Sequence, residues 1–489
     1  MNFSGEYQSK AHKYTEVIFG AGQTFRAGTI ATLADKTAYG YVRKYYEEQG
    51  KTKRRSEMER LALGCTGVRR STGQHPGGIV VLPLGQDINS FTPVQHPAND
   101  METDTVTTHF DYHSIDHNLL KLDILGHDDP TMIRMLQDMT GVDPLTIPLD
   151  SMEVMSLFWN TEALGITPDQ IGGTKLGALG IPEFGTDFAM QMVIDAEPKS
   201  FSDLVRIAGL AHGTDVWLGN AQKLIQEGTA TISTAICTRD DIMTYLIQMG
   251  VEPEKSFKIM EAVRKGTVAK GKCEKWAEWK KDMLDHDVPQ WYVWSCEKIK
   301  YMFPKAHAAA YVMMAWRIAY CKIHYPLAYY GAYFSIRAKA FSYELMCQGK
   351  EHLEAIMADY KRRMDASSNK ESGAEPLSNK EEAAYSDMRI VQEMYARGYE
   401  FMPIDIFRAQ SRSFQIIDGK LMPSINSIEG LGEKAADAIV EAAKDGPFLS
   451  KDDFRERTKV SKTVVDLMAS LNLLGDLPES NQLSLFDLV

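Results

Sequence analysis

The sequence changes character near residue 130, and this change limits the folds that the chain can adopt. Before it, three short runs are typical of strands: Gly77–Pro83, Thr105–Tyr112 and Leu119–Gly126. The first 49 residues are typical of helices with a break in the middle. From residue 130 to about residue 363 the pattern is mainly helical and rich in methionine and aromatic residues. We therefore expect an α+β fold, mostly helical, with a small sheet near the N-terminus.

Composition narrows the class of protein. A length of 489 residues predicts several domains, and 44% hydrophobic with 25% charged residues is typical of an ordinary soluble protein. The formal net charge of −12 argues against an overall basic coat but leaves room for a local basic groove. No apolar run approaches the roughly 20 residues that span a bilayer, and no signal-peptide pattern opens the chain. The six scattered cysteines form no CxxC pair, so we expect a reduced, cytoplasmic protein without a membrane association or a cysteine zinc site.

Asp123 stands inside the apolar run Leu119–Gly126, which we interpret as a buried strand. An ionised carboxylate in apolar surroundings costs several kcal/mol unless it is paired or bound to a cation. Strand alternation places Lys121 on the same face, so a structural ion pair is one interpretation. A divalent cation is the other. Two-metal phosphoryl transfer would then need one or two further carboxylates.

Three histidines follow one another at four-residue spacing: His109, His113 and His117. On a helix they would share one face and could bind zinc. The residues around them are typical of strand and turn, which would scatter the three side chains. We therefore do not expect a zinc site here.

Two segments of the N-terminal region combine basic residues with features that suit phosphate. In the segment 69–83, arginines precede His75 and two glycines, and glycines let backbone amides approach an anion closely. A glycine turn with surface arginines is the alternative. Residues 40–64, which include Arg54 and Arg55, predict a basic helix–loop–helix that could lie along phosphates, or else a solvated charged hairpin.

The helical region holds a second group of basic residues. Lys305 and His307 stand at the predicted start of a long helix, where charge and free amides together favour an anion. Arg206, Arg239 and the lysine-rich segment 263–281 lie upstream. Solvated helix faces explain most such runs, but several in one region favour phosphate binding.

Two features mark the C-terminal region. Gly430-Leu-Gly432 lies between a short helical turn and a helix, which is typical of a helix–hairpin–helix and not of a dinucleotide-binding βαβ unit. Backbone amides of such a hairpin, with Lys434, can hold a DNA phosphate without reading sequence. In the polar tail, the run from Gln482 contains Leu483, Leu485 and Phe486. This apolar cluster indicates binding to a partner's groove, or else packing against its own domain.

Taken in order, these motifs resemble the C-family replicative polymerases, the α subunit of bacterial DNA polymerase III, most closely of the PolC type. The resemblance covers essentially the whole chain. The matching segments are 2–8, 69–83, 109–136, 179–186, 211–222, 239–243 and 303–312, together with the hairpin and the tail.

The resemblance implies a domain order and a set of roles. The domains would be a palm remnant (1–8), thumb (9–64), palm (65–129), fingers (130–363), linker (364–381), duplex-binding domain (382–477) and clamp-binding tail (478–489). Asp123 would be the third catalytic carboxylate of a nucleotidyltransferase-like palm and a ligand of Mg²⁺. The residues around the incoming triphosphate would be Arg206, Arg239, Lys305, His307 and His75. Those on DNA would be Arg54, Arg55, Gly430, Gly432 and Lys434, and those on the sliding clamp Gln482, Leu483, Leu485 and Phe486.

The chain also departs from the family. In the family, two aspartates separated by one residue stand just before the Asn-Phe-Ser-Gly stretch that begins here at Asn2. The sequence has no counterpart of that pair, nor of the upstream OB-fold, polymerase-and-histidinol-phosphatase and exonuclease domains. We therefore expect a late-called start or a fragment. Its incomplete palm would leave an open strand edge, and by itself it would have little or no polymerase activity.

The function expected from the resemblance is that of the C-terminal portion of a DNA-directed DNA polymerase. The complete enzyme would join a dNTP to a primer 3′-hydroxyl, with primer–template DNA, the sliding clamp and other replisome subunits as partners. A non-catalytic DNA- and clamp-binding module, or one half of a split polymerase, is the alternative. A small-molecule nucleotidyltransferase fits poorly, because it has no use for a duplex-binding hairpin or a clamp peptide.

Overall fold

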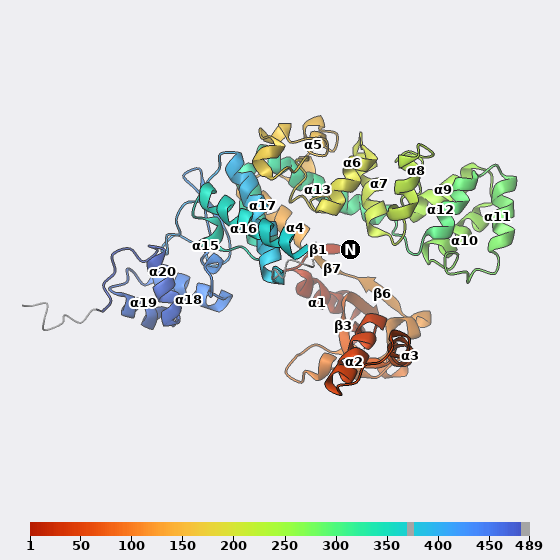
Figure 1. Ribbon diagram of the computed structural model, residues 1–489. Helices are drawn as coiled ribbons and strands as arrows, with labels where there is room; N and C mark the ends of the chain where they lie inside the picture. The colour runs from red at the N-terminus through yellow and green to blue at the C-terminus, as the bar shows by residue number, and fades with distance from the viewer. Residues whose placement is uncertain (369–375, 481–489) are drawn as a thin grey trace, which may run out of the picture. The chain divides into compact units, whose positions relative to one another are not determined.

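The structure, a computed structural model, describes residues 1–368 and 376–480 (Figure 1). The chain divides into two compact units, Met1–Thr131 and Met132–Val489. Helices are the main element and the sheets are small, so the predicted α+β, mostly helical class is confirmed. Within the described ranges, every helix is too short or too polar to cross a membrane.

The first unit is built on a five-stranded sheet. In spatial order its strands are β4 (Val94–Gln95), β5 (Thr107–Thr108), β2 (Thr24–Thr32), β3 (Arg69–Val81) and β6 (Leu120–Asp123). The long antiparallel pair β2–β3 forms its centre. Gly28 of β2 lies so close to β5 that any Cβ there would collide with the carbonyl of Thr108. The crossing of these strands therefore requires glycine.

Two further features complete the first unit. Strand β1 (Asn2–Ser4) pairs in parallel with β7 (Leu125–His127), and helix α1 (Gln8–Phe19) follows. The buried His12 of α1 donates a hydrogen bond to the carbonyl of Ile124, at 3.0 Å. Helices α2 (Asp35–Glu48) and α3 (Arg55–Cys65) pack on each other through three buried side chains, those of Ala38, Val42 and Ala62. The predicted helix–loop–helix is therefore present.

Three predictions about this unit need correction. The first 49 residues are not simply helical with a break, because the break is the nine-residue strand β2. The predicted strand Thr105–Tyr112 is reduced to β5, since the chain leaves the sheet at His109 and turns, with Asp111 accepting a hydrogen bond from the backbone of His113. The run Leu119–Gly126 is not one buried strand. It divides into β6 and β7, and β6 is an edge strand whose outer residues are exposed.

The second unit is a helical body. Helix α4 (Asp128–Thr140) leads into it from the first unit. The helices that follow are α5 (Met152–Ser156), α6 (Asp187–Ala196), α7 (Phe201–His212), α8 (Gln222–Gln226), α9 (Arg239–Gln248), α10 (Pro253–Arg264), α11 (Trp276–Asp285), α12 (Gln290–Lys298), α13 (Lys305–His324), α14 (Pro326–Ala332), α15 (Tyr343–Met346), α16 (Lys350–Ser368) and α17 (Asn379–Ala396). Helix α13 is the longest of them and buries half of its 20 residues, including Val312 and Trp316.

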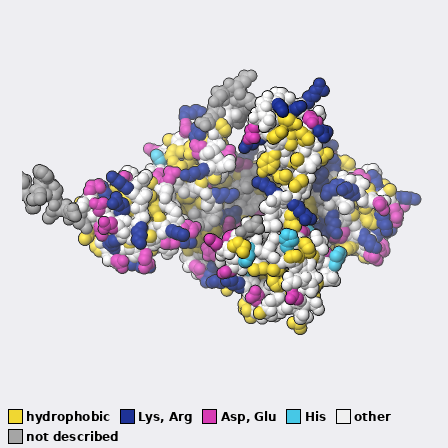
Figure 2. Space-filling model, turned by 90° about the horizontal axis from the view of Figure 1, so that it is seen from below, with side chains coloured by type: hydrophobic (Ala, Val, Ile, Leu, Met, Phe, Trp, Pro, Cys, Tyr) yellow, Lys and Arg dark blue, Asp and Glu magenta, His cyan; other side chains and the backbone are white. Residues whose placement is uncertain are grey.

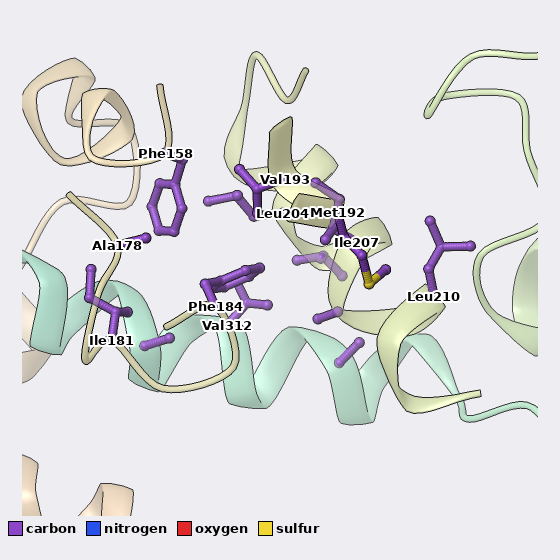
Figure 3. Close-up of a cluster of buried hydrophobic side chains, with 14 of the residues drawn as sticks. Phe158, Ala178, Ile181, Phe184, Met192, Val193, Leu204, Ile207, Leu210 and Val312 are labelled. Carbon is purple, nitrogen blue, oxygen red and sulfur yellow. The ribbon is translucent and has the colours of Figure 1, made fainter. Parts of the chain in front are cut away.

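A single large core holds this body together. Figure 3 shows Phe158 and Phe184, from non-helical segments, beside Val193 of α6 and Leu204 of α7, with Val312 of α13 close to Phe184. The rings of Phe158 and Phe184 meet edge to face, with centroids 5.1 Å apart. Loop residues therefore pack into this core together with the helices, which fixes the conformation of those loops.

The C-terminal part of the second unit has its own small core, from Ile404 to Leu474 with Tyr343. Its elements are β8 (Gln415–Ile417), β9 (Lys420–Met422), α18 (Glu433–Lys444), α19 (Lys451–Thr458) and α20 (Lys462–Ser470). Helix α17 buries its apolar face in the large core and not in this one. Helix α16 also extends to Ser368, past the start of the predicted linker at residue 364.

Candidate functional site

Asp123 lies at the end of edge strand β6, opposite Gly78 of β3. Its side chain is 53% exposed, so the prediction of a buried carboxylate is wrong. Lys121 Nζ lies 3.3 Å from Asp123 Oδ1, which is the ion pair that alternation on one face suggested. The amino group of Met1 donates to the backbone carbonyl of Asp123, at 2.9 Å. The carboxylate is therefore accessible, and its backbone is tied to the start of the chain.

The residues described do not by themselves form a complete cation site. Across residues 1–368 and 376–480, no group of three or more His, Cys, Asp or Glu side chains could hold a metal ion, which includes the three histidines from His109 to His117. Asp123 can supply one carboxylate ligand. A magnesium ion needs several more oxygen ligands than this.

His75 lies beside Lys121, and its backbone contacts fix its protonation. Its Nδ1 accepts hydrogen bonds from the amides of Gly77 (3.1 Å) and Gly78 (2.7 Å). Burial, and the nearby Lys121 charge, lower the pKa of His75. The ring is therefore neutral with its proton on Nε2, which lies 3.3 Å from Lys121 Nζ. Two donors converge here, an arrangement that suits a shared anionic oxygen.

The other predicted phosphate-binding residues lie in the second unit, where two helix N-termini meet. Helix α9 begins at Arg239, whose amide donates to the carbonyl of Phe303 at 3.2 Å. Helix α13 begins at Lys305, whose amide donates to Asp240 Oδ2 at 2.6 Å. Arg239 Nε is buried and has no hydrogen-bond partner within the described part of the chain. A buried, unsatisfied guanidinium N–H is unusual and suits an anionic ligand.

Arg206 and His307 belong to the same neighbourhood. Burial raises the pKa of the Cys237 thiol, while the charges of Arg206 and Lys305, and a hydrogen bond from Arg206, oppose that rise. The thiol is therefore close to both cations. The ring of His307 stacks on Phe303, with centroids 4.9 Å apart. The structure thus gathers Arg206, Arg239, Lys305 and His307 within one unit, while Asp123 and His75 belong to the other.

The predicted DNA-contacting residues lie on two separate surfaces. Arg54 precedes α3, and Arg55 begins it as an exposed side chain paired with Glu59. Gly430 has a φ of +77°, which opens the predicted hairpin between a short helical turn (Ile425–Ser427) and α18. Gly432 and Lys434 are exposed. The helices α18 to α20, at the left of Figure 2, carry basic side chains interspersed with acidic ones.

The tail residues Gln482, Leu483, Leu485 and Phe486 lie outside the described residues.

Sequence reasoning missed two polar pairs. Glu183 Oε2 lies 2.6 Å from His212 Nε2, and the fully buried Lys322 pairs with the fully buried Glu393 at 2.9 Å. The available signals were an acid within the glycine-flanked stretch 180–185, a histidine at the end of a helix before glycine, and a lysine within the apolar face of a helix. None of these signals names the partner.

Comparison with protein families matches three parts of the chain. Residues 129–287 match the bacterial DNA polymerase III alpha subunit finger domain. Residues 41–126 match the bacterial DNA polymerase III alpha NTPase domain. Residues 398–483 match a helix–hairpin–helix motif. The hairpin at Gly430 lies within the last match.

Curated relatives match the chain over nearly its whole length. DNA polymerase III PolC-type from Caldanaerobacter subterraneus is 54% identical over 486 residues, which is 99% of this chain and 34% of that protein. The PolC-type proteins of Bacillus cereus and Bacillus subtilis are 54% and 53% identical over 487 residues each, and the chain covers 33% of each. The chain thus spans about a third of the length of these relatives. It belongs to the bacterial DNA polymerase III alpha family and corresponds to a portion of a PolC-type member.

Proposed function

We propose that this chain is the portion of a replicative DNA polymerase that binds the incoming nucleotide and the DNA. The complete enzyme adds dNTPs to a primer 3′-hydroxyl under the direction of a template. The observation that carries the proposal is the match of 99% of the chain, at 54% identity, to PolC-type DNA polymerase III.

The geometry of the second unit supports a triphosphate-binding role. The N-termini of α9 and α13 are tied together by hydrogen bonds and carry Arg239 and Lys305, with Arg206 alongside. Helix N-termini and cations both stabilise phosphate, and their effects add. The buried Nε–H of Arg239 has no hydrogen-bond acceptor among the described residues. Within the first unit, and considered by itself, His75 presents its Nε2–H next to Lys121, which is a separate pair of donors suited to an anion.

Asp123 is accessible enough to bind a divalent cation, which we take to be Mg²⁺. Phosphoryl transfer depends on positioning and on neutralising charge, which such a cation supplies when bound. Within this chain, Lys121 is the counter-ion of Asp123 in the absence of metal. The remaining ligands would come from other parts of the complete polymerase.

The DNA- and partner-binding roles rest on separate surfaces. The α2–α3 pair presents Arg54 and Arg55 at an exposed helix start, which suits contact with a phosphate backbone. The hairpin at Gly430 and Gly432, with exposed Lys434, suits sequence-independent contact with duplex DNA. The tail from Gln482 to Phe486 would bind the sliding clamp. A cytoplasmic location and association with other replisome subunits belong to the same proposal.

The decisive experiment uses the full-length parent polymerase carrying Asp123→Asn. We expect primer extension to be abolished while primer–template binding stays within about twofold of wild type, because only the metal-binding charge is lost. Asp116→Asn is the matched control, since Asp116 is another partly exposed acid of the same unit. Normal extension by the Asp123 variant would contradict the proposal.

For the 489-residue chain alone, a second function is favoured by one observation. The described residues contain no complete metal cluster, so DNA and clamp binding without catalysis fits the isolated chain. We expect the purified chain to bind primer–template DNA and to show little or no extension. Robust incorporation by this chain would contradict this second candidate.

A further inference from the structure

Glu183 adopts a backbone conformation that residues other than glycine rarely take. Its φ is +67°, in the left-handed region. Its carboxylate lies 2.6 Å from His212 Nε2, and the two side chains are only 17% and 26% exposed. Strained backbone at a short, charge-assisted hydrogen bond indicates that the surroundings impose this conformation.

Hydrogen bonds from Lys322 fix the loop that carries Glu183. The ammonium donates to the carbonyls of Gly177 (2.8 Å) and Leu179 (2.6 Å), and to Glu393. The end of the loop folds back on its beginning, because any Cβ at Gly185 would lie 2.6 Å from the backbone nitrogen of Gly180. The loop therefore cannot relax without disturbing the core, and Glu183 is fixed toward His212.

His212 in turn lies at the centre of a group of aromatic rings. It ends helix α7, and its ring contacts Phe303 (5.6 Å between centroids), His307 (5.4 Å) and Tyr311 (5.9 Å). The contact with His307 is edge to face, at 83°. Because Glu183 accepts the Nε2 proton of His212, it fixes the tautomer and the ring plane of that histidine. The edge-to-face geometry between His212 and His307 is thereby fixed as well.

We propose that Glu183 and His212 are positioning residues that fix the orientation of the His307 ring. In the proposed function, His307 belongs with Arg206, Arg239 and Lys305 to the residues that receive the nucleotide triphosphate. This inference rests on the proposed function. Glu183 acts through His212, and His307 lies within the first turn of α13 together with Lys305. Because the buried loop already sets the orientation of the His307 ring, no conformational entropy is lost in ordering that ring when the nucleotide binds. This preorganisation favours affinity.

Two variants and one control test the proposal. Glu183→Ala removes the acceptor, and Glu183→Gln keeps an oxygen that can accept the His212 proton. Glu382→Ala is the matched control, because Glu382 lines the same cavity of about 530 Å³ as Glu183 but is an exposed side chain of α17. Each substitution is made in the 489-residue chain for NMR of histidine labelled with ¹³C, and in the full-length parent for steady-state dNTP incorporation.

We expect Glu183→Ala to shift the His307 ring signals and to raise the KM for dNTP about tenfold, with kcat changed less than about threefold. Glu183→Gln should recover most of the KM, and Glu382→Ala should match wild type in both measurements. A general loss of structure would instead lower kcat and would move most histidine signals together. If Glu183→Ala fails to fold, Glu183→Gln still tests the proposal, because a raised KM or shifted His307 signals in a variant that keeps the acceptor oxygen would overturn it.

Other outcomes overturn the inference or the function in distinguishable ways. Wild-type KM in Glu183→Ala would overturn the inference, whether or not the His307 signals shift, and would leave the polymerase proposal intact. Equal effects of Glu183→Ala and Glu382→Ala on the KM for dNTP would also overturn the inference. The loss of one negative charge from the shared cavity would then explain both effects. Failure of the wild-type parent to incorporate any dNTP would overturn the proposed function, and the inference with it.

Discussion

The Asp123 region of the first unit and the start of α13 in the second unit hold their charged groups in different ways. Asp123 ends an edge strand, is half exposed and pairs with one lysine on its own strand. At α13, Glu183 and His212 are mostly buried, and the loop beneath them rests on a fully buried ion pair. The exposed Asp123 carboxylate can exchange Lys121 for another partner, whereas the buried Glu183–His212 pair keeps one geometry. The comparison indicates that the Glu183–His212 pair is preorganised, whereas the Asp123 carboxylate is accessible to other partners.

The largest effect should come from the buried pair of the second unit. Both Lys322 and Glu393 are 0% exposed, Tyr330 donates to the carboxylate at 2.7 Å, and burial lowers the pKa of Lys322 to about 8, so the lysine is charged at neutral pH. We expect Glu393→Gln to lower the free energy of unfolding by about 3 to 5 kcal/mol, because it leaves a buried charge unpaired. Urea unfolding of the 489-residue chain measures this.

A double variant supplies the control for that prediction. Lys322→Met combined with Glu393→Leu removes both charges, so we expect it to recover much of the stability lost in the single variant. A loss below about 1 kcal/mol in Glu393→Gln would remove the contrast between the two regions.

An intermediate effect should come from Asp387 of α17, which is 2% exposed. Burial raises the pKa of Asp387 to about 6, although the amides of Lys339 and Ala340 donate to it and oppose the rise. Since the folded protein holds this proton more tightly than the unfolded chain, Asp387 makes stability fall as pH rises from about 4 to 6. The shift corresponds to roughly 2 to 3 kcal/mol.

Asp387→Asn should remove that pH dependence while keeping an oxygen for the two amides. Denaturation of wild type and variant at several pH values between 4 and 7.5 gives the difference. The variant should be the more stable of the two at pH 7.5, and the two should converge near pH 4. Parallel curves over the whole range would show that this carboxyl titrates normally.

The smallest effect on stability should come from Asp123 itself. Because the side chain is half exposed and its ion pair is screened by water, Asp123→Asn should change the free energy of unfolding by no more than about 0.5 kcal/mol. Thermal unfolding of the 489-residue chain measures this. A loss above about 1.5 kcal/mol would mean that Asp123 holds the first unit together and would erase the difference between the two regions.

Sequence patterns predicted the parts of this molecule whose signals are local. The division into strands and helices, the α2–α3 pair and the hairpin at Gly430 each depend on residues within about thirty positions of one another. The burial of Asp123 was predicted wrongly, because an apolar run does not distinguish an edge strand from a central one. The strand β2 was missed for a related reason, since its paired residues in β3 lie between 37 (Thr32 with Arg69) and 57 (Thr24 with Val81) positions away.

The candidate site shows the same limit. A helix start with Lys305 and His307 could be predicted from adjacent residues. The pairing of Glu183 with His212 joins residues 29 positions apart, and that of Lys322 with Glu393 joins residues 71 apart. Such pairs are selected by tertiary packing, which periodicity in one sequence does not report.

The hydrogen bonds of Lys322 limit how parts of the second unit can move relative to one another. The ammonium of Lys322 ties the last turn of α13 to the loop at Gly177 and Leu179 and to α17. Sliding α13 along its axis would strip three acceptors from a cation that no water can reach. These segments should therefore move together as one rigid body in any conformational change of the second unit, with any bending confined to joints outside it.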